Sequence, residues 1–390
     1  MKEHWLLDPS VTFLNHGSFG ATPKAVLAKQ HEFRRRMELE PVRFLVRELE
    51  PLLDQVRADL ANFIGAAPDD LAFVPNATSG VNAVLRSLEF SSSDELLVTN
   101  QEYNACRNTI DYVAARSGAR VRVVEIPFPL PVTGDVFDCV IGSVTGATRL
   151  LLIDHITSQT AIIMPVERIV AELHARGIDT LIDGAHVAGQ LPLDIRAIGA
   201  AYYTGNLHKW VCAPKGAAFL YVRSDRREGM HPIVISHGLN STRTDRSRFH
   251  LEFDWPGTFD PTAWLAAGEA LRFIPSLVEG GWPEVMRRNH TLALRARDIL
   301  CHALHLDRPA PDDLLGSMAA FPIPDGKPGD VASVFGDPLQ DALFDQYRIE
   351  VPVVPWPNPP KRLVRVSAQL YNVEEDYVRL AEALSHLLQS

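Results

Sequence analysis

The sequence predicts an α/β architecture, and its pattern of short apolar runs is the first evidence. These runs have the length of strands buried on both faces, and amphipathic segments such as 166–176 separate several of them. Strands of this kind, with helices between them, form a largely parallel sheet covered by helices. With 390 residues, 46% of them hydrophobic, the chain is long enough for two domains of unequal size. The predicted strands are 95–98, 121–126, 150–153, 180–182, 200–203 and 217–222.

A regular apolar stripe predicts one of the helices. Its residues are spaced 4-3-4-3, which places them on one face of a helix that ends at Gly65. A longer helix, rich in Ala and Leu, is expected from about Asp260 and would cross into the second domain. The tail predicts a strand at 363–366 and a helix at 373–388, with Asn372 as the N-cap. The residues of the stripe are Leu49, Leu53, Val56, Leu60 and Phe63.

Charge, hydropathy and cysteine content exclude several classes of protein. With 38 basic and 48 acidic residues the net charge is −10, which argues against a nucleic-acid or anionic-membrane partner. No apolar run reaches the roughly 18–20 residues of a membrane span, and residues 1–5 lack the apolar core of a secretory signal. The four cysteines are scattered without CxxC spacing, so we expect reduced thiols in a cytoplasmic protein.

A lysine and a carboxylate near the ends of two predicted strands point to a specific chemistry. Asp183 ends the apolar run 180–182, and Lys209 follows the run 200–203, 26 positions after Asp183 (209 − 183). This spacing suits one strand–helix–strand step, which brings both side chains to neighbouring strand ends of one sheet. An amine that can form a Schiff base, near a carboxylate that keeps a pyridinium nitrogen protonated, is the minimum equipment for pyridoxal phosphate chemistry.

Two further features predict binding sites for anionic groups. A helix is expected to begin after Asn76, because an i, i+3, i+4, i+7 apolar stripe starts at Val81. Its N-terminus offers backbone N–H groups and the Thr78 hydroxyl to a phosphate. In the strand 363–366, two-residue alternation places Arg365 on the face opposite its two valine neighbours. Its planar guanidinium suits a substrate α-carboxylate.

Several motifs together resemble one family. The segment 202–215, YYTGNLHKWVCAPK, is similar to the lysine loop of the isopenicillin N epimerase-like proteins. They form a branch of the class V aminotransferase family of fold-type I pyridoxal-phosphate enzymes. The resemblance covers residues from about 12 to 375. Its other motifs are LNHGSFG at 14–20, PNATSG at 75–80, DGAH at 183–186 and RVS at 365–367.

The resemblance implies an architecture and an assembly. A large domain would contain a mostly parallel seven-stranded sheet, beside a smaller α+β C-terminal domain. Residues 1–20 would form an N-terminal arm packing with the small domain, residues 21–264 the large cofactor-binding domain, and residues 265–390 the small domain. The protein would be a homodimer, in which Thr258 reaches the phosphate site of the neighbouring subunit.

The resemblance also implies a role for each residue of the site. The catalytic group would comprise Lys209, which carries pyridoxal 5′-phosphate, Asp183 at the pyridine nitrogen, and His186 against the ring. Ser158 would lie near the phenolic oxygen of the cofactor. Tyr103 would stack on the ring, a role that passes to Asn104 if the alignment slips by one residue. The remaining cofactor contacts would come from Ala77, Thr78, Thr204, Asn206, His208 and Thr258, and substrate contacts from Asn15, His16 and Arg365.

For the reaction, the resemblance favours an epimerase or racemase acting at the α-carbon of an amino acid. Two alternatives stay open: a C–S β-lyase resembling cysteine desulfhydrases, and an aminotransferase. The sequence does not reveal which groups surround the α-carbon of the substrate, and these groups decide between the reactions. Persulfide chemistry, as in the more distantly similar cysteine desulfurases, is not expected. Residues 311–390 contain no cysteine, and Cys301 falls within a helical pattern.

A metal-dependent hydrolase is a remote alternative from a different class. Histidines and carboxylates at strand ends are typical metal ligands, but no pair here has HExxH spacing. This alternative also leaves Lys209 and Thr78 without a role, so we expect no metal site. Its candidate ligands are Asp154, His155, Asp183, His186 and His208.

Overall fold

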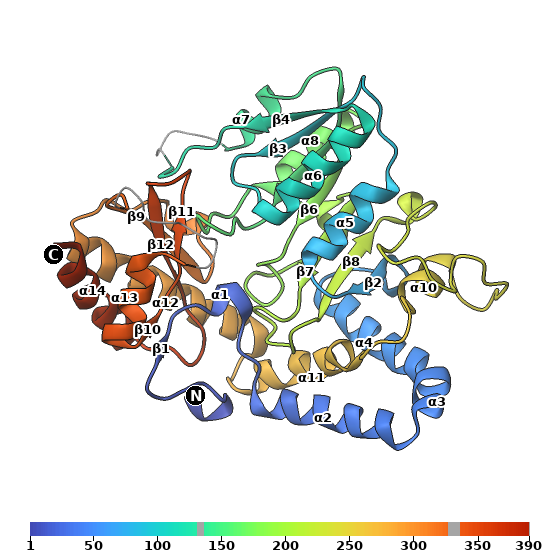
Figure 1. Cartoon of the computed structure of the whole chain (residues 1–390), viewed down its shortest axis with the longest axis horizontal. Coiled ribbons are helices and arrows are strands. Elements are labelled where there is room, and N and C mark those ends of the chain that lie inside the picture. The colour runs from blue at the N-terminus through green and yellow to red at the C-terminus, as the bar shows by residue number, and fades with distance from the viewer. Residues whose placement is uncertain (131–135, 327–335, 390) are drawn as a thin grey trace.

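The computed structural model describes residues 1–130, 136–326 and 336–389. The chain forms a large part built around one sheet and a smaller part that contains the C-terminus (Figure 1). In the large part the strands are β2 (Leu71–Val74), β3 (Glu95–Thr99), β4 (Arg120–Val124), β5 (Thr148–Asp154), β6 (Asp179–Asp183), β7 (Tyr202–Asn206) and β8 (Ala218–Val222).

The seven strands of the large sheet lie in the order β2-β8-β7-β6-β5-β3-β4. The five from β7 to β4 are parallel, whereas β8 is antiparallel to both of its neighbours. The prediction of a mostly parallel seven-stranded sheet is therefore confirmed. The strand β2, a fully apolar run of four residues, was not among the predicted strands.

Alternation along the buried strands sends side chains into two separate cores. In β5, for example, Leu150 and Leu152 belong to one apolar cluster, and Leu151 and Ile153 to the other. One face is covered by α5 (Ala77–Ser87), α6 (Asn104–Ser117) and α10 (Arg248–Phe253). The opposite face is covered by α2 (Lys24–Leu39), α4 (Leu49–Phe63), α7 (Val136–Gly142), α8 (Val166–Ala175), α9 (Ile195–Ile198) and α11 (Thr262–Ser276).

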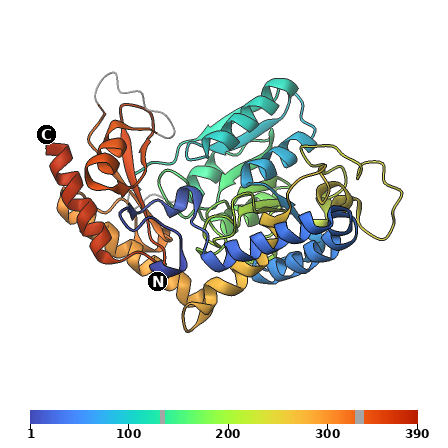
Figure 2. The same cartoon turned by 60° about the horizontal axis from the view of Figure 1, so that its bottom comes forward.

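The smaller part combines an antiparallel sheet with helices. Its strands β9 (Met318–Ile323), β11 (Val353–Pro355) and β12 (Arg362–Ser367) lie in the order β11-β12-β9. Near the N-terminus, β1 (Thr12–Phe13) pairs in parallel with β10 (Ile349–Glu350), so the first residues are attached to the C-terminal part (Figure 2). The remaining helices are α1 (His16–Phe19), α3 (Pro41–Arg43), α12 (Gly281–Leu304), α13 (Pro338–Tyr347) and α14 (Glu374–Gln389).

The passage between the two parts runs along two helices. The helix α11 packs on α2 and α4 of the large part, and α12 packs on α14 and β9 of the small part. The predicted domain limits at residues 20 and 264 remain predictions, and residues 327–335 and 390 of the predicted small domain lie outside the described residues. Within the described ranges, no helix is both long and apolar enough to span a bilayer.

The start of α14 differs from the prediction. The Asn372 side-chain oxygen accepts a hydrogen bond from the Gln369 N–H, and its amide donates to the Phe13 carbonyl and to the Asp376 carboxylate, so the oxygen caps no N–H of the helix. The backbone N–H of Val373 is instead bonded by the Asp376 carboxylate. Asn372 as the N-cap was therefore wrong, because a tertiary contact with the N-terminal arm outweighs the local capping preference.

Candidate active site

The predicted site lies where the parallel strands end. In the register of the sheet, Asp154 at the end of β5 is opposite Asp183 at the end of β6, which is in turn opposite Thr204 of β7. Glu102 and Tyr103 follow β3 in the loop before α6. The carboxyl ends of parallel strands are the usual location of ligand sites in such sheets.

The amine of Lys209 is buried between Arg365 and a group of acidic side chains. Its Nζ atom is 3.0 Å from Nε2 of His186, whose Nδ1 accepts a 3.5 Å hydrogen bond from Trp210. Burial and the positive charge of Arg365 lower the pKa of Lys209 to about 7. A substantial fraction of the amine is therefore neutral near pH 7, which is the form that attacks a carbonyl carbon.

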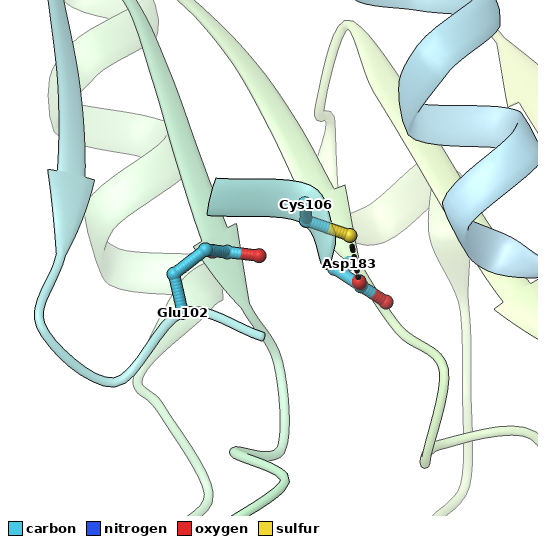
Figure 3. A group of neighbouring side chains, drawn as sticks. All are labelled: Glu102, Cys106 and Asp183. Atoms are coloured by element: carbon cyan, nitrogen blue, oxygen red, sulfur yellow. Dashed lines mark hydrogen bonds between the residues drawn. The ribbon is translucent and has the colours of Figure 1, made fainter. Parts of the chain in front are cut away.

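Asp183 is held by two hydrogen bonds. Its Oδ1 accepts the Ala185 N–H at 2.9 Å, and its Oδ2 accepts the thiol of Cys106 at 3.2 Å (Figure 3). Burial raises the pKa of Asp183, while the hydrogen bonds from Cys106 and Ala185 lower it. Among the described residues no lysine or arginine forms a salt bridge with this carboxylate. Asp183 can therefore form an ion pair with a cationic ring nitrogen.

Glu102, Cys106 and Asp183 have ligand atoms within 4.8 Å of one another, which is the spacing of a possible metal site. Burial and the charge of Asp183 raise the pKa of the Cys106 thiol well above its usual range. The thiol therefore stays protonated and donates to Asp183. This group is better described as a hydrogen-bonded acidic cluster.

The five ligands of the metal-hydrolase alternative do not converge in the described part of the chain. His155 bonds to the Tyr203 hydroxyl through Nδ1, His208 to the Ala217 carbonyl, and His186 to Lys209. Their ligand atoms form no common group there.

The N-terminus of α5, where the phosphate corner is predicted, is organised by two asparagine side chains. Asn76 caps this helix by accepting the Ser79 N–H, and Asn206 accepts the Ala77 N–H at 2.8 Å. The backbone amide and the hydroxyl of Thr78 stay available to an anion at this end of the helix. Asn206, the last residue of β7, thus positions the helix end, and His208 lies just after this strand.

Thr204 has a different role from the predicted one. Its hydroxyl donates to the Phe219 carbonyl at 2.8 Å, and its side chain lies directly beneath Gly80 of α5. A side chain at position 80 would collide with it, since an added Cβ would be 2.8 Å from the Thr204 Cβ. We therefore assign Thr204 to the close packing of α5 on β7 and not to the phosphate.

Arg365 is fixed by two serines. Its Nη1 donates to the carbonyl and hydroxyl oxygens of Ser158, and its Nη2 donates to the Ser18 hydroxyl at 2.8 Å. The Nε atom is buried without a hydrogen-bond partner among the described residues, so the guanidinium keeps donor capacity for an incoming carboxylate. Ser158 therefore contacts Arg365, and Ser18 is a contributor that the sequence did not single out.

A cavity of about 530 Å³ is lined by Lys209 and Arg365, but its described lining does not include Asp183, His186 or Thr78. Of the predicted residues, it is lined by Asn15, Tyr103, Asn104, Ser158, Lys209 and Arg365. The opposite wall is apolar and comes from the proline-rich segment 352–359, which includes Trp356. Phe19, Glu102, Arg107 and Glu350 also line it and were missed by the prediction, because only tertiary folding brings their segments together.

His16 and Thr258 lie outside this cavity. His16 is fully buried, with Nδ1 2.8 Å from the Tyr371 hydroxyl and Nε2 3.0 Å from the Lys209 carbonyl oxygen. It therefore supports the backbone of the lysine loop and does not face a substrate. Thr258 is exposed in the segment between α10 and α11.

The residues present fit pyridoxal phosphate. A lysine with a pKa of about 7 lies within the same cluster of charges as the buried Asp183 carboxylate. The helix end at Thr78, on the same edge of the sheet, offers donors to a phosphate group.

Comparison with known proteins identifies the family. The model of the family described as "Aminotransferase class-V" matches residues 13–379. The chain belongs to this family. Class V aminotransferases are enzymes that depend on pyridoxal phosphate, so both the predicted cofactor and the prediction of an enzyme are confirmed. The protein is thus a pyridoxal-phosphate-dependent enzyme that acts on amino acids.

Two kinds of relatives are similar over nearly the whole chain. Isopenicillin N epimerase of Amycolatopsis lactamdurans is 37% identical, over 99% of this chain and 97% of the relative. The epimerase of Streptomyces clavuligerus is 34% identical, over 98% and 96%. The probable chloroplastic L-cysteine desulfhydrase of Arabidopsis thaliana is 31% identical, over 98% and 84%.

Solved structures show the same fold. A mutant of C-DES with glycine covalently linked to its pyridoxal phosphate is 21% identical with a TM-score of 0.81, and the match covers 99% of each chain. The cystine C–S lyase C-DES in complex with cysteine persulfide is 22% identical with a TM-score of 0.79, over 97% and 98%. The predicted fold-type I architecture is confirmed.

Proposed function

We propose that this class V enzyme is an epimerase or racemase that inverts the α-carbon of an amino acid whose side chain is larger than that of cysteine. The observation that carries the proposal is the cavity of about 530 Å³, with Lys209 and Arg365 on one side and the apolar wall 352–359 on another. Bound pyridoxal phosphate would occupy part of this volume, and the remainder, beside the apolar wall, would hold the substrate side chain. The similarity to two isopenicillin N epimerases supports the same choice.

Each group of the site has a defined task in this proposal. Bound pyridoxal phosphate supplies an electron sink for the pair left when the α-carbon loses its proton. Arg365, oriented by Ser18 and Ser158, holds the substrate carboxylate. The amine of Lys209 takes the proton, and His186 holds that amine at 3.0 Å. Asp183 keeps a proton on the ring nitrogen, supported by the Cys106 thiol.

A panel of L-amino acids in deuterated water tests the proposal. Exchange at the α-carbon with loss of optical activity, and without keto acid or pyruvate, is the expected result for at least one substrate with a long side chain. The Lys209→Ala variant is the control and should give neither signal. Exchange without inversion across a broad panel would contradict the proposal.

A C–S β-lyase is the second candidate, because the similarity to plant cysteine desulfhydrases extends over the whole chain. No cysteine is among the described residues that line the cavity, so the persulfide route of a desulfurase has no nucleophile there. Release of pyruvate and sulfide from L-cysteine in the same panel would favour the lyase over the epimerase.

We also propose that the protein is a cytoplasmic homodimer. Supporting features are the exposed Thr258 and, on the long segment before α10, four exposed apolar side chains. Exposed apolar groups in one segment are typical of an interface. All four cysteines are free thiols, in keeping with a reducing compartment. The four apolar residues are Ile233, Val234, Ile235 and Leu239.

A further inference from the structure

Three buried carboxyl groups lie together at the carboxyl edge of the large sheet, and only Asp183 has a role in the proposal above. Asp154 occupies the position opposite it on β5, and Glu102 lies within 4.8 Å of it (Figure 3). The exposed fractions of Glu102, Asp154 and Asp183 are 5%, 2% and 1%. Within the described residues no arginine or lysine forms a salt bridge with any of the three. Three charges so placed cannot all persist, so protons must occupy some of them.

Hydrogen-bond donors distinguish one member of the cluster. Asp183 accepts the Ala185 N–H on one oxygen and the Cys106 thiol on the other. In contrast, within the described residues neither oxygen of Glu102 has a well-formed hydrogen bond, nor has Oδ2 of Asp154. Burial raises the pKa of both carboxyls, and the nearby backbone amide of Tyr103 lowers each by less. A hydrogen bond to the charged form of a carboxyl favours ionisation of that carboxyl over its neighbours. The cluster therefore has a built-in preference for where its charge resides.

We propose that Cys106 is a positioning residue whose thiol, together with the Ala185 amide, fixes the negative charge of this acidic cluster on Asp183, while Glu102 and Asp154 are held as neutral acids. The thiol acts through Asp183, the carboxylate that would hold the proton on the ring nitrogen of the cofactor. This inference rests on the cofactor and not on which reaction the enzyme performs, so a failure of the epimerase proposal leaves it intact.

The charges that face the cluster agree with this assignment. Burial and the neighbouring carboxylates raise the pKa of Glu102 well above its usual range, and burial and Asp183 do the same for Asp154. Burial and Asp183 also raise the pKa of Cys106, so the thiol remains a donor at neutral pH. Lys209 is the facing cation, and the partly buried Tyr103 hydroxyl faces the cluster in its neutral form.

Infrared difference spectra of the full-length holoenzyme test the proton positions without reference to activity. At neutral pH, Glu102→Gln and Asp154→Asn should each remove a carbonyl-stretching band of a protonated carboxyl group, whereas Asp183→Asn should remove none. The S–H band lost in Cys106→Ala should be lower in frequency than the band lost in the matched control Cys301→Ala, and should rise when Asp183 is replaced. Absence of protonated-carboxyl bands that depend on Glu102 or Asp154 would overturn the assignment.

Cofactor affinity gives a second readout. Cys106→Ala should raise the dissociation constant for pyridoxal phosphate about three- to tenfold, as expected for the loss of one weak hydrogen bond to a charged group. Cys106→Ser, which keeps a donor, should stay within about twofold of wild type, as should Cys301→Ala. Thermal melting of each variant separates this effect from misfolding. A stably folded Cys106→Ala protein with wild-type affinity and an unchanged carboxyl spectrum would refute the role of the thiol.

Discussion

At the scale of single residues, the chemistry of this enzyme depends on shifted proton equilibria. Lys209 is made nucleophilic by burial and by Arg365, and Asp183 is kept available by a thiol and an amide. The sequence predicted Lys209, Asp183 and Arg365 because their types and spacing suit one chemistry. It missed Cys106 and Ser18, because the role of a thiol or hydroxyl depends on its hydrogen-bond partner, and only tertiary folding brings that partner close.

Replacing Lys209 with alanine should abolish turnover and the cofactor adduct that borohydride traps on the protein. The amine is the nucleophile of the site, and the neighbouring Lys215 is exposed. Mass spectrometry of the reduced, digested protein checks this. Lys215→Ala is the matched control and should keep both activity and the adduct. A trapped adduct in Lys209→Ala would assign the cofactor to another lysine.

The reactivity of Lys209 toward acetic anhydride, in protein freed of cofactor, should rise with pH and reach half its maximum near pH 7. The neutral amine is the reactive form, and the pKa of Lys209 is lowered to about 7. Because Arg365 contributes to this lowering, Arg365→Met should raise the pKa and move the midpoint to higher pH. Labelling of the Lys209 peptide is measured by mass spectrometry. A midpoint near that of an ordinary lysine would show that the amine is solvated.

Asp183→Asn should retain the cofactor but reduce kcat by on the order of 10²–10³-fold, as for other preorganised electrostatic groups. The amide has no charge to keep the ring nitrogen protonated. Steady-state kinetics together with the visible spectrum of the holoenzyme test this expectation. The exposed Asp245→Asn provides a comparison outside the site. Activity within twofold of wild type would remove Asp183 from the mechanism.

At the scale of elements, the site depends on how closely α5 approaches β7. The apolar stripe of α5 and its start after Asn76 were predictable from periodicity and capping, and both agree with the structure. The contact between Gly80 and Thr204 was not predictable, because it joins residues from two distant segments. The four-residue strand β2 was missed for a related reason: its strand conformation depends on pairing with β8, a segment far away in the sequence.

Gly80→Ala should destabilise the protein by about 1–3 kcal/mol, as for other overpacked sites, and should weaken cofactor binding. The added methyl group collides with Thr204 and displaces the N-terminus of α5 from the phosphate corner. Gly146→Ala is the matched control, since no atom lies within 4 Å of its added Cβ. Thr204→Gly in the Gly80→Ala background should recover part of the cofactor affinity. Thermal melting and titration with pyridoxal phosphate measure both effects.

At the scale of the whole molecule, length and the alternation of strands with helices were sufficient to predict the sheet and its coverage. The cavity wall 352–359 was not predicted. This proline-rich segment has little periodicity, and only tertiary folding brings it into the same cavity as Lys209 and Arg365. In the proposed homodimer, a second chain would likewise bring a distant residue to the site, because its Thr258 would complete the phosphate corner.

Mixing two inactive variants tests that assembly. Lys209→Ala lacks the reactive amine but keeps Thr258, whereas Thr258→Glu keeps the amine and places a negative charge near the partner's phosphate. After unfolding and refolding together, random pairing should restore about a quarter of wild-type activity, because half of the dimers are mixed and each contains one intact site. Each variant refolded alone is the control. No recovery from mixed dimers would show that Thr258 does not cross the interface.

The support of Lys209 comes from the two ends of the chain. His16 bonds to the Lys209 carbonyl and to the Tyr371 hydroxyl, and Gly20 lies so close to the loop that an added Cβ would be 2.9 Å from the Lys209 Cα. Tyr371 follows β12 and is 162 residues beyond Lys209 (371 − 209). The lysine loop therefore gains this brace only when the segment after β12 has packed against the N-terminal arm. A mutation that loosens that distant segment should thus disturb the reactive amine without touching the cofactor site.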